Sequence, residues 1–231
     1  MQGLQYTLPQ GGVSCGCTHQ GGLNVIVLAS RQAERSYMTL SAVRAFIAVE
    51  LPVVIQEQLG QIIAGLQNHS PRSVRWVAPR NIHLTLKFFG NISPENLSQL
   101  TRVIQNEAQR SRPFDLSIAG LGAFPNKIHP RVIWAGAVAP PALGELQLGI
   151  DRETERLGYR NEDRGFNPHL TLGRVSQHAT PAEVKQISEL LGRTTVGSLG
   201  TINVVGLRLF RSDLQPGGAV YTPLFDARLG K

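Results

Sequence analysis

Cysteine is nearly absent from this 231-residue chain, and both of its cysteines, Cys15 and Cys17, lie close to the first residue. A disulfide-stapled miniprotein is therefore excluded, and a core without cysteine fits the cytoplasm better than an oxidising compartment. A Cys-x-Cys pair with one nearby histidine, His19, lacks the second ligand pair of a structural zinc site, so we expect no metal there.

Long hydrophobic runs are also missing. The apolar stretch at residues 23–29 spans seven residues, whereas a membrane helix needs roughly 20. No basic stretch precedes it, and no cleavage pattern typical of a secretory signal follows it. Residues 1–37 contain glycine pairs and no sustained period, and a regular pattern opens only at Met38. We therefore expect residues 1–37 to be a disordered or non-native extension and residues 38–231 to form a single two-lobed domain.

Acidic residues are outnumbered, at 16 Asp and Glu against 23 Lys and Arg, which gives a formal net charge of +7. This excess favours an anionic partner such as RNA, a nucleotide or a membrane surface, without choosing among them. Hydrophobic residues make up 42% of the chain and charged residues 17%. That composition excludes a disordered chain, a coiled coil and a collagen-like fibre.

The hydrophobic pattern predicts an α+β fold of mixed or antiparallel sheet with helices outside, because strands outnumber helices and the helices fall between strand pairs. Pro52, Ser93-Pro94, Pro140-Pro141 and Thr180-Pro181 mark the expected helix starts, the last with a complete capping box. The expected strands cover residues 43–49, 73–77, 82–89, 114–118, 131–138, 166–175, 202–210 and 219–225, and the last two are expected to close a terminal hairpin.

One tetrapeptide occurs twice: His83-Leu84-Thr85-Leu86 returns unchanged as His169-Leu170-Thr171-Leu172, 86 residues later. Each copy lies on an expected strand, and Ser-Pro or Thr-Pro with an acid follows about ten residues further on. This indicates a duplicated strand-loop-helix unit and predicts two lobes related by a pseudo-twofold axis, with a cleft between them. Side chains alternate along a strand, so the leucines should anchor each strand while His and Thr project together from the other face.

Two imidazoles and two hydroxyls in one cleft suit a phosphodiester. Imidazole titrates near neutral pH, so one histidine can act as base and the other as acid on opposite sides of phosphorus. No carboxylate cluster accompanies the motif, which disfavours a two-metal phosphoesterase. A structural role is the usual reading of one His-x-Thr, but a duplication that served packing alone would keep the leucines and let His and Thr drift. A zinc site would need a third ligand that is missing.

The two motifs and their flanks resemble the 2H phosphoesterase superfamily, and within it the RNA 2′,3′-cyclic phosphodiesterases, also called 2′-5′ RNA ligases. The resemblance covers residues 42–228. The flanking stretches that carry it are residues 44–49, 75–77, 131–134, 166–168 and 221–224.

The resemblance implies hydrolysis of an RNA 2′,3′-cyclic phosphate end to a 2′-phosphate without metal or cofactor. It gives His83 as proton donor to the leaving 3′ oxygen, His169 as proton acceptor from water, and Thr85 and Thr171 as holders of the phosphate oxygens. Because the motifs are identical, the residues alone leave donor and acceptor unassigned. Weak reverse 2′-5′ ligation is also implied.

Further substrate contacts are expected from strand parity. Lys87 shares parity with His83 and should face the cleft, where it and Arg131 are candidates for phosphate contacts. Phe89 has the same parity and is a candidate stacking surface, whereas Phe88 shares parity with the leucines and is expected in the core. The remaining histidines are expected at the surface: His19, His69, His129 and His178.

Two other functions stay open at this point. The same chemistry on small nucleotide cyclic phosphates or 2′-5′ oligoadenylates would turn over cyclic mononucleotides as fast as RNA. A non-catalytic RNA-binding module would use the histidines only to capture phosphate. We expect a cytoplasmic monomer with an RNA or oligonucleotide partner and no membrane association.

Overall fold

The computed structural model describes residues 42–161 and 165–231. The predictions for residues 1–37, including the absence of a metal at Cys15, Cys17 and His19, lie outside these residues.

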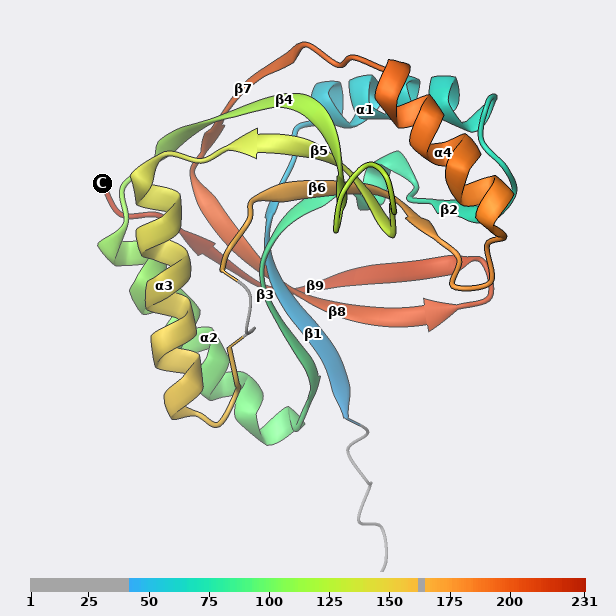
Figure 1. Cartoon of the computed structure of the whole chain (residues 1–231). Helices are drawn as coiled ribbons and strands as arrows, with labels where there is room; N and C mark the ends of the chain where they lie inside the picture. Colours follow the sequence, from blue (N-terminus) through green and yellow to red (C-terminus); the bar gives the residue numbers. More distant parts are fainter. Residues whose placement is uncertain (1–41, 162–164) are drawn as a thin grey trace, which may run out of the picture. The chain divides into compact units, whose positions relative to one another are not determined.

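A single curled sheet organises the described chain (Figure 1). Its main path runs β7-β4-β5-β6-β3-β1-β8-β9, β2 is added against β6, and every pairing is antiparallel. The α+β prediction is confirmed. The strands are β1 (Val43–Glu50), β2 (Val74–Trp76), β3 (His83–Ile92), β4 (Phe114–Phe124), β5 (Val132–Val138), β6 (His169–Val175), β7 (Ser198–Val204), β8 (Gly206–Gln215) and β9 (Gly218–Arg228).

The helices begin close to the predicted positions. Thr180 caps α4 with the complete capping box, in which its hydroxyl accepts from the Glu183 amide. Ser93 makes no side-chain cap, and its proline opens a short 3-10 turn before α2 instead. The helices are α1 (Val53–Gln67), α2 (Leu97–Arg110), α3 (Pro141–Arg156) and α4 (Pro181–Arg193), with 3-10 turns at Pro79–Asn81 and Pro94–Asn96. No helix in the described ranges is long and apolar enough to cross a membrane.

Helices cover the outer side of the curl (Figure 1). α2 and α3 pack against each other and contact β3, β8 and β9, and α1 contacts β7. The motif leucines, Leu84, Leu86, Leu170 and Leu172, all belong to the main hydrophobic core. Burial of such side chains stabilises the fold by roughly 1.5–3 kcal/mol each. The leucines therefore anchor the two motif strands, as the alternation predicted.

The motif strands are neighbours. β3 and β6 lie side by side at the centre of the main path. One half of the path is β7, β4, β5 and β6, and the other half is β3, β1, β8 and β9. Their one paired position joins Leu84 and Leu170. The two halves thus meet edge to edge in one sheet, and the motif side chains share one face of that sheet.

The strand predicted over residues 202–210 is wrong as a single element. The chain leaves β7, which pairs with β4, and enters β8, which pairs with β1 and β9. Val205 separates the two strands, and Gly206 follows it where a side chain would lie 2.8 Å from the Ala227 carbonyl oxygen. The chain therefore passes from one half of the sheet to the other at a residue where only glycine fits. The predicted terminal hairpin is confirmed as β8 and β9.

Candidate active site

Strand register brings the two motifs together. Leu84 and Leu170 are partners in an antiparallel pair. The same register sets His83 beside Thr171 and Thr85 beside His169, because residues that flank an antiparallel pair oppose each other in reverse order. All four side chains lie on the side opposite the buried leucines, and all four are half-buried. We call this side of the sheet the motif face.

Both histidines are held in the same tautomer. The Nδ1 atom of His83 lies 2.8 Å from the Asn81 carbonyl oxygen, and that of His169 lies 2.7 Å from the Asn167 carbonyl oxygen. A carbonyl only accepts, so each Nδ1 is the protonated donor. Each Nε2 is then left with a lone pair when the ring is neutral. A backbone contact two residues upstream thus prepares both rings for proton transfer at the same atom.

Aromatic rings enclose His83. Its ring stacks on Phe46 at 4.6 Å between centroids and meets the edge of Tyr221 at 5.2 Å. Burial lowers the pKa of His83 to about 4, and the positive charges of Arg174 and His169 act in the same direction, against the hydrogen bond to Asn81. His83 is therefore neutral at pH 7 when no ligand is present.

His169 has a more open setting. Phe124 is its one aromatic neighbour in the described chain, edge-on at 5.0 Å between centroids. The second histidine thus lacks the stacked ring that lies under the first.

The two threonine hydroxyls are available to a ligand. Neither Thr85 nor Thr171 makes a side-chain hydrogen bond to any residue in 42–161 or 165–231. A half-buried hydroxyl on the motif face can donate to one oxygen of a phosphate held between the histidines. No group of three or more His, Cys, Asp or Glu gathers within the same residues as a metal ligand set.

A β-bulge follows each motif and reverses the strand parity beyond it. Thr85 lies opposite Ala48 and Lys87 opposite Ile47, so Leu86 is an extra residue in β3. Thr171 lies opposite Trp134 and Gly173 opposite Ile133, so Leu172 is the corresponding extra residue in β6. A bulge sends the next side chain to the other face. The two copies therefore share a backbone bulge as well as the tetrapeptide sequence.

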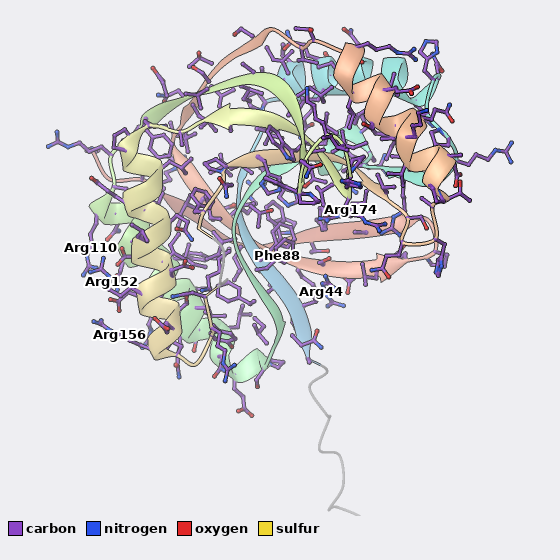
Figure 2. All side chains as sticks on the ribbon, in the orientation of Figure 1. Arg44, Phe88, Arg110, Arg152, Arg156 and Arg174 are labelled. Atoms are coloured by element: carbon purple, nitrogen blue, oxygen red, sulfur yellow. The ribbon has the colours of Figure 1, made fainter. Side chains whose placement is uncertain are left out.

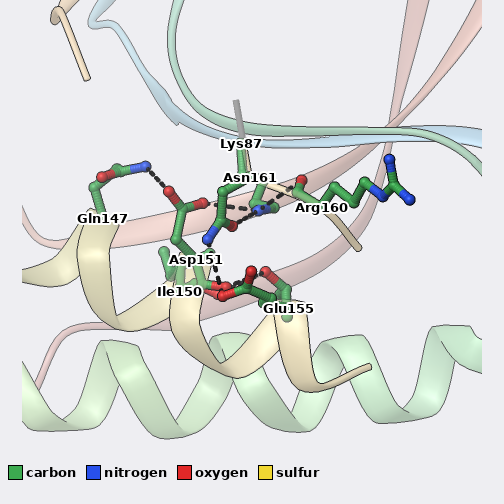
Figure 3. A network of polar contacts seen from close by, with 8 residues as sticks. Lys87, Gln147, Ile150, Asp151, Glu155, Arg160 and Asn161 are labelled. Carbon is green, nitrogen blue, oxygen red and sulfur yellow. Dashed lines mark hydrogen bonds and ion pairs between the residues drawn. The ribbon is translucent and has the colours of Figure 1, made fainter. Parts of the chain in front are cut away.

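The bulge makes the predicted orientation of Lys87 wrong. Its side chain turns away from the motif face and is 4% exposed. Its ammonium group pairs with Asp151 at 2.8 Å and donates to the Asn161 side chain at 2.5 Å (Figure 3). It also reaches the Arg160 carbonyl oxygen. Lys87 thus ties β3 to α3 and to the chain that precedes the second motif.

Phe88 and Phe89 exchange their expected places for the same reason. Phe89 packs against Tyr159, with 5.1 Å between ring centroids. Phe88 is 38% exposed and lies 5.2 Å from the Phe46 ring, which itself stacks on His83. Phe88 is therefore on the motif face, and the prediction of a core position for it is wrong.

Arg174 is the residue that the sequence analysis missed. It follows the bulge of β6 as Phe88 follows that of β3, each five residues after its histidine. Figure 2 shows Arg174 and Phe88 on the inner side of the curled sheet. Comparing the two copies beyond the fourth residue would have paired these positions in the sequence.

Arg131 immediately precedes β5 and lies beside the C-terminal end of β6. Its guanidinium donates to the Ser176 carbonyl oxygen at 3.2 Å, one residue after β6 ends. No hydrogen bond joins it to a motif residue among the described positions. The surface positions predicted for His69, His129 and His178 are confirmed.

Known proteins have similar sequences and structures. A model of the family described as LigT like Phosphoesterase matches residues 49–134 and 137–221. An RNA 2′,3′-cyclic phosphodiesterase of Methanothermobacter thermautotrophicus is 36% identical over 81% of this chain and 99% of its own. A protein of the same name from Archaeoglobus fulgidus is 32% identical over 78% of this chain and 97% of its own.

Solved structures show the same fold. The crystal structure of TT0787 of Thermus thermophilus superposes with a TM-score of 0.68 at 31% identity, over 81% of this chain and 99% of that one. Escherichia coli LigT in complex with 3′-AMP gives a TM-score of 0.66 at 28% identity, over 82% and 99%. The chain therefore belongs to the LigT-like phosphoesterase family of the 2H superfamily.

Proposed function

We propose that this protein hydrolyses RNA 2′,3′-cyclic phosphate ends to 2′-phosphates by a two-histidine mechanism without metal or cofactor. The observation that carries the proposal is the pair of His-Thr units on one face, in antiparallel register and in the same tautomer. The names of the relatives support the same substrate.

The two proton transfers of the reaction are divided between the two histidine rings. In the proposed step, Nε2 of His169 accepts a proton from water as the water oxygen attacks phosphorus. The bond from phosphorus to the 3′ oxygen breaks, and His83 donates the proton that this oxygen needs as it leaves. The product carries a 2′-phosphate, and the proton gained by His169 returns through solvent. Attack by an RNA 5′ hydroxyl in place of water gives weak 2′-5′ ligation by the same transfers.

In this mechanism His83 must become protonated when the substrate binds. The low pKa of the free ring, about 4, makes it a strong acid once protonated. The cyclic phosphate carries a negative charge, and an anion next to an imidazolium raises its pKa. The dependence of kcat/KM on pH should therefore reflect a His83 that is neutral in the free protein.

The remaining groups on the motif face are proposed to bind the phosphate charge and a nucleobase. Thr85 and Thr171 are proposed to donate to the two non-bridging oxygens, where charge develops as water attacks. Arg174 adds a cation whose charge reaches His83. Phe88 offers a half-exposed ring for stacking. Lys87 and Phe89 are replaced in these roles by Arg174 and Phe88, and Arg131 is left at the periphery.

The test is direct. The protein is treated with EDTA and incubated with an RNA oligonucleotide that ends in a 2′,3′-cyclic phosphate, and the product is read by phosphorus NMR. A 2′-phosphate formed by the wild type and lost in His83→Ala and His169→Ala supports the proposal. A strict metal requirement, or RNA binding with no turnover, contradicts it, the second outcome being that expected of a binding module.

A further inference from the structure

The two ends of the motif face differ in charge. At the His83 end, Arg75 of β2 lies opposite Arg174 of β6. Burial raises the pKa of the neighbouring Tyr221 phenol, and the positive charges of Arg174, Arg44 and Arg75 act against that rise. Arg75 and Arg174 make no ion pair with a carboxylate in residues 42–161 or 165–231, whereas Arg44 lies opposite Asn91, toward the other end of the face. Glu50, opposite His83, and Asp226 both pair with Arg208. The His83 end therefore holds two arginines, Arg75 and Arg174, that no described carboxylate pairs, beside the ion pair of Glu50 and Arg208.

A pocket of about 310 Å³ adjoins His83 at this end. Its lining includes Arg80, Asn81, Gln56 and Tyr221, together with Glu50 and its ion-pair partner Arg208. The volume is at the lower limit of small-molecule sites, which run from roughly 300 to 1,000 Å³. Amide and phenol groups suit the hydrogen-bonding edges of a nucleoside, and the exposed guanidinium of Arg80 suits a phosphate.

The His169 end has a different setting. Phe124 meets the His169 ring edge-on. In the antiparallel register of β3 and β6, the residues that follow Thr85 run past His169, and Phe88 is among them. A stacking ring suits a neutral group better than a phosphate chain, and Arg44, opposite Asn91 of β3, is a cation beyond Phe88 at this end.

The chemistry of the reaction makes the two ends unequal. In an in-line displacement the attacking oxygen and the leaving oxygen lie on opposite sides of phosphorus. The leaving 3′ oxygen belongs to the ribose of the terminal nucleotide, from which the rest of the RNA continues with one negative charge per residue. The polyanionic strand and the proton donor must therefore share one side, and water or a 5′ hydroxyl must approach from the other.

We propose, resting on the function above, that the RNA strand bearing the cyclic phosphate lies at the His83 end, with its preceding phosphodiester on Arg75 and Arg80 and its preceding nucleoside in the adjoining pocket. The attacking group enters at the His169 end. This polarity makes an oligonucleotide end a better substrate than a cyclic mononucleotide, which fills the phosphate site alone. It also agrees with the assignment of His83 as proton donor.

The test compares two substrates in full-length protein. The kcat/KM is measured for a 2′,3′-cyclic mononucleotide and for a tetranucleotide ending in the same cyclic nucleotide, at several salt concentrations. Wild-type protein should prefer the tetranucleotide. Arg80→Gln and Arg75→Gln should each lower that preference at least tenfold. Each should also flatten the salt dependence for the tetranucleotide, since every lost phosphate contact reduces the slope by about 0.7.

Arg152→Gln provides the matched control. Arg152 is an exposed arginine on α3, outside the curl of the sheet (Figure 2). It should leave the preference unchanged. Equal loss on both substrates in Arg80→Gln and Arg75→Gln, or an unchanged preference, would overturn the polarity. A wild type that turns over neither substrate would instead contradict the proposed function.

Discussion

The two copies of the motif share a backbone and differ in their surroundings. Both have the carbonyl contact to Nδ1, the threonine hydroxyl without a partner among the described residues, and the bulge at the fourth residue. Beyond the bulge, the inward position is Lys87 in one copy and Gly173 in the other. The outward position is Phe88 in one and Arg174 in the other.

The differences follow the asymmetry of the substrate. In the proposed reaction a phosphodiester presents similar oxygens to both halves, so identical His-Thr units would suffice to hold it. The groups on either side of phosphorus are unlike, and the outward residues and the settings of the two rings differ accordingly. The repeated part of the fold thus serves the symmetric part of the proposed reaction.

The largest expected effect comes from removing either imidazole. His83→Ala and His169→Ala should each lower kcat by roughly 10²-fold to 10⁴-fold, the usual contribution of a general acid or base. Steady-state kinetics on cyclic-phosphate RNA measures this. Full activity in His169→Ala would refute the two-histidine scheme.

The residues at the inward position should differ in what they contribute to stability. Lys87→Met leaves Asp151 without its buried partner and should lower the free energy of unfolding by about 3 kcal/mol. Gly173→Ala places a methyl 2.8 Å from Trp76 and should cost about 1–3 kcal/mol. Urea denaturation measures both.

An exposed ion pair serves as the control for Lys87. Lys185 lies 3.9 Å from Glu189 on α4, and Lys185→Met should change the free energy of unfolding by less than about 0.5 kcal/mol. A similarly small loss in Lys87→Met would show that the Lys87 network does not hold the fold.

The enclosed histidine should make stability depend on pH. The pKa of His83 is about 4 in the folded chain against an ordinary 6.5, so the unfolded state binds more protons between these values and stability falls as pH falls through them. The loss should reach about 3 kcal/mol at pH 4. His83→Gln should remove this part of the slope. Parallel curves for the two proteins would show that His83 is not held neutral by the fold.

The smallest effect on activity is expected from the hydroxyls. Thr85→Val and Thr171→Val each remove one hydrogen bond to a phosphate oxygen and should lower kcat/KM about tenfold, which corresponds to about 1.4 kcal/mol. The double variant should lose about the product of the two. An unchanged kcat/KM in both single variants would remove the threonines from the site.

Much of the fold followed from local pattern. The spacing of apolar residues and the prolines at helix starts located the four α-helices of the described residues, and the capping box at Thr180 was visible in the sequence. The strand at residues 202–210 was misjudged because its division at Val205 depends on where β4 and β1 lie in the sheet. That arrangement is tertiary and leaves no period in the sequence.

The motif residues were predictable and their neighbours were not. Alternation holds from His83 to Leu86 and then fails, since the bulge adds one residue and sends Lys87 inward. The bulge is defined by pairing with β1, which lies more than thirty residues upstream. A comparison of the two copies carried to the fifth residue after each histidine would still have singled out Phe88 and Arg174.

The central claim is that the two histidines act on opposite sides of phosphorus, with His83 on the leaving oxygen. An RNA 2′,3′-cyclic phosphate with sulfur in place of the bridging 3′ oxygen tests it most directly, because a thiolate leaves without needing a proton. We predict that His83→Ala regains most of the wild-type rate on this substrate while His169→Ala stays impaired. Rescue of His169→Ala instead, or of neither variant, would contradict the assignment.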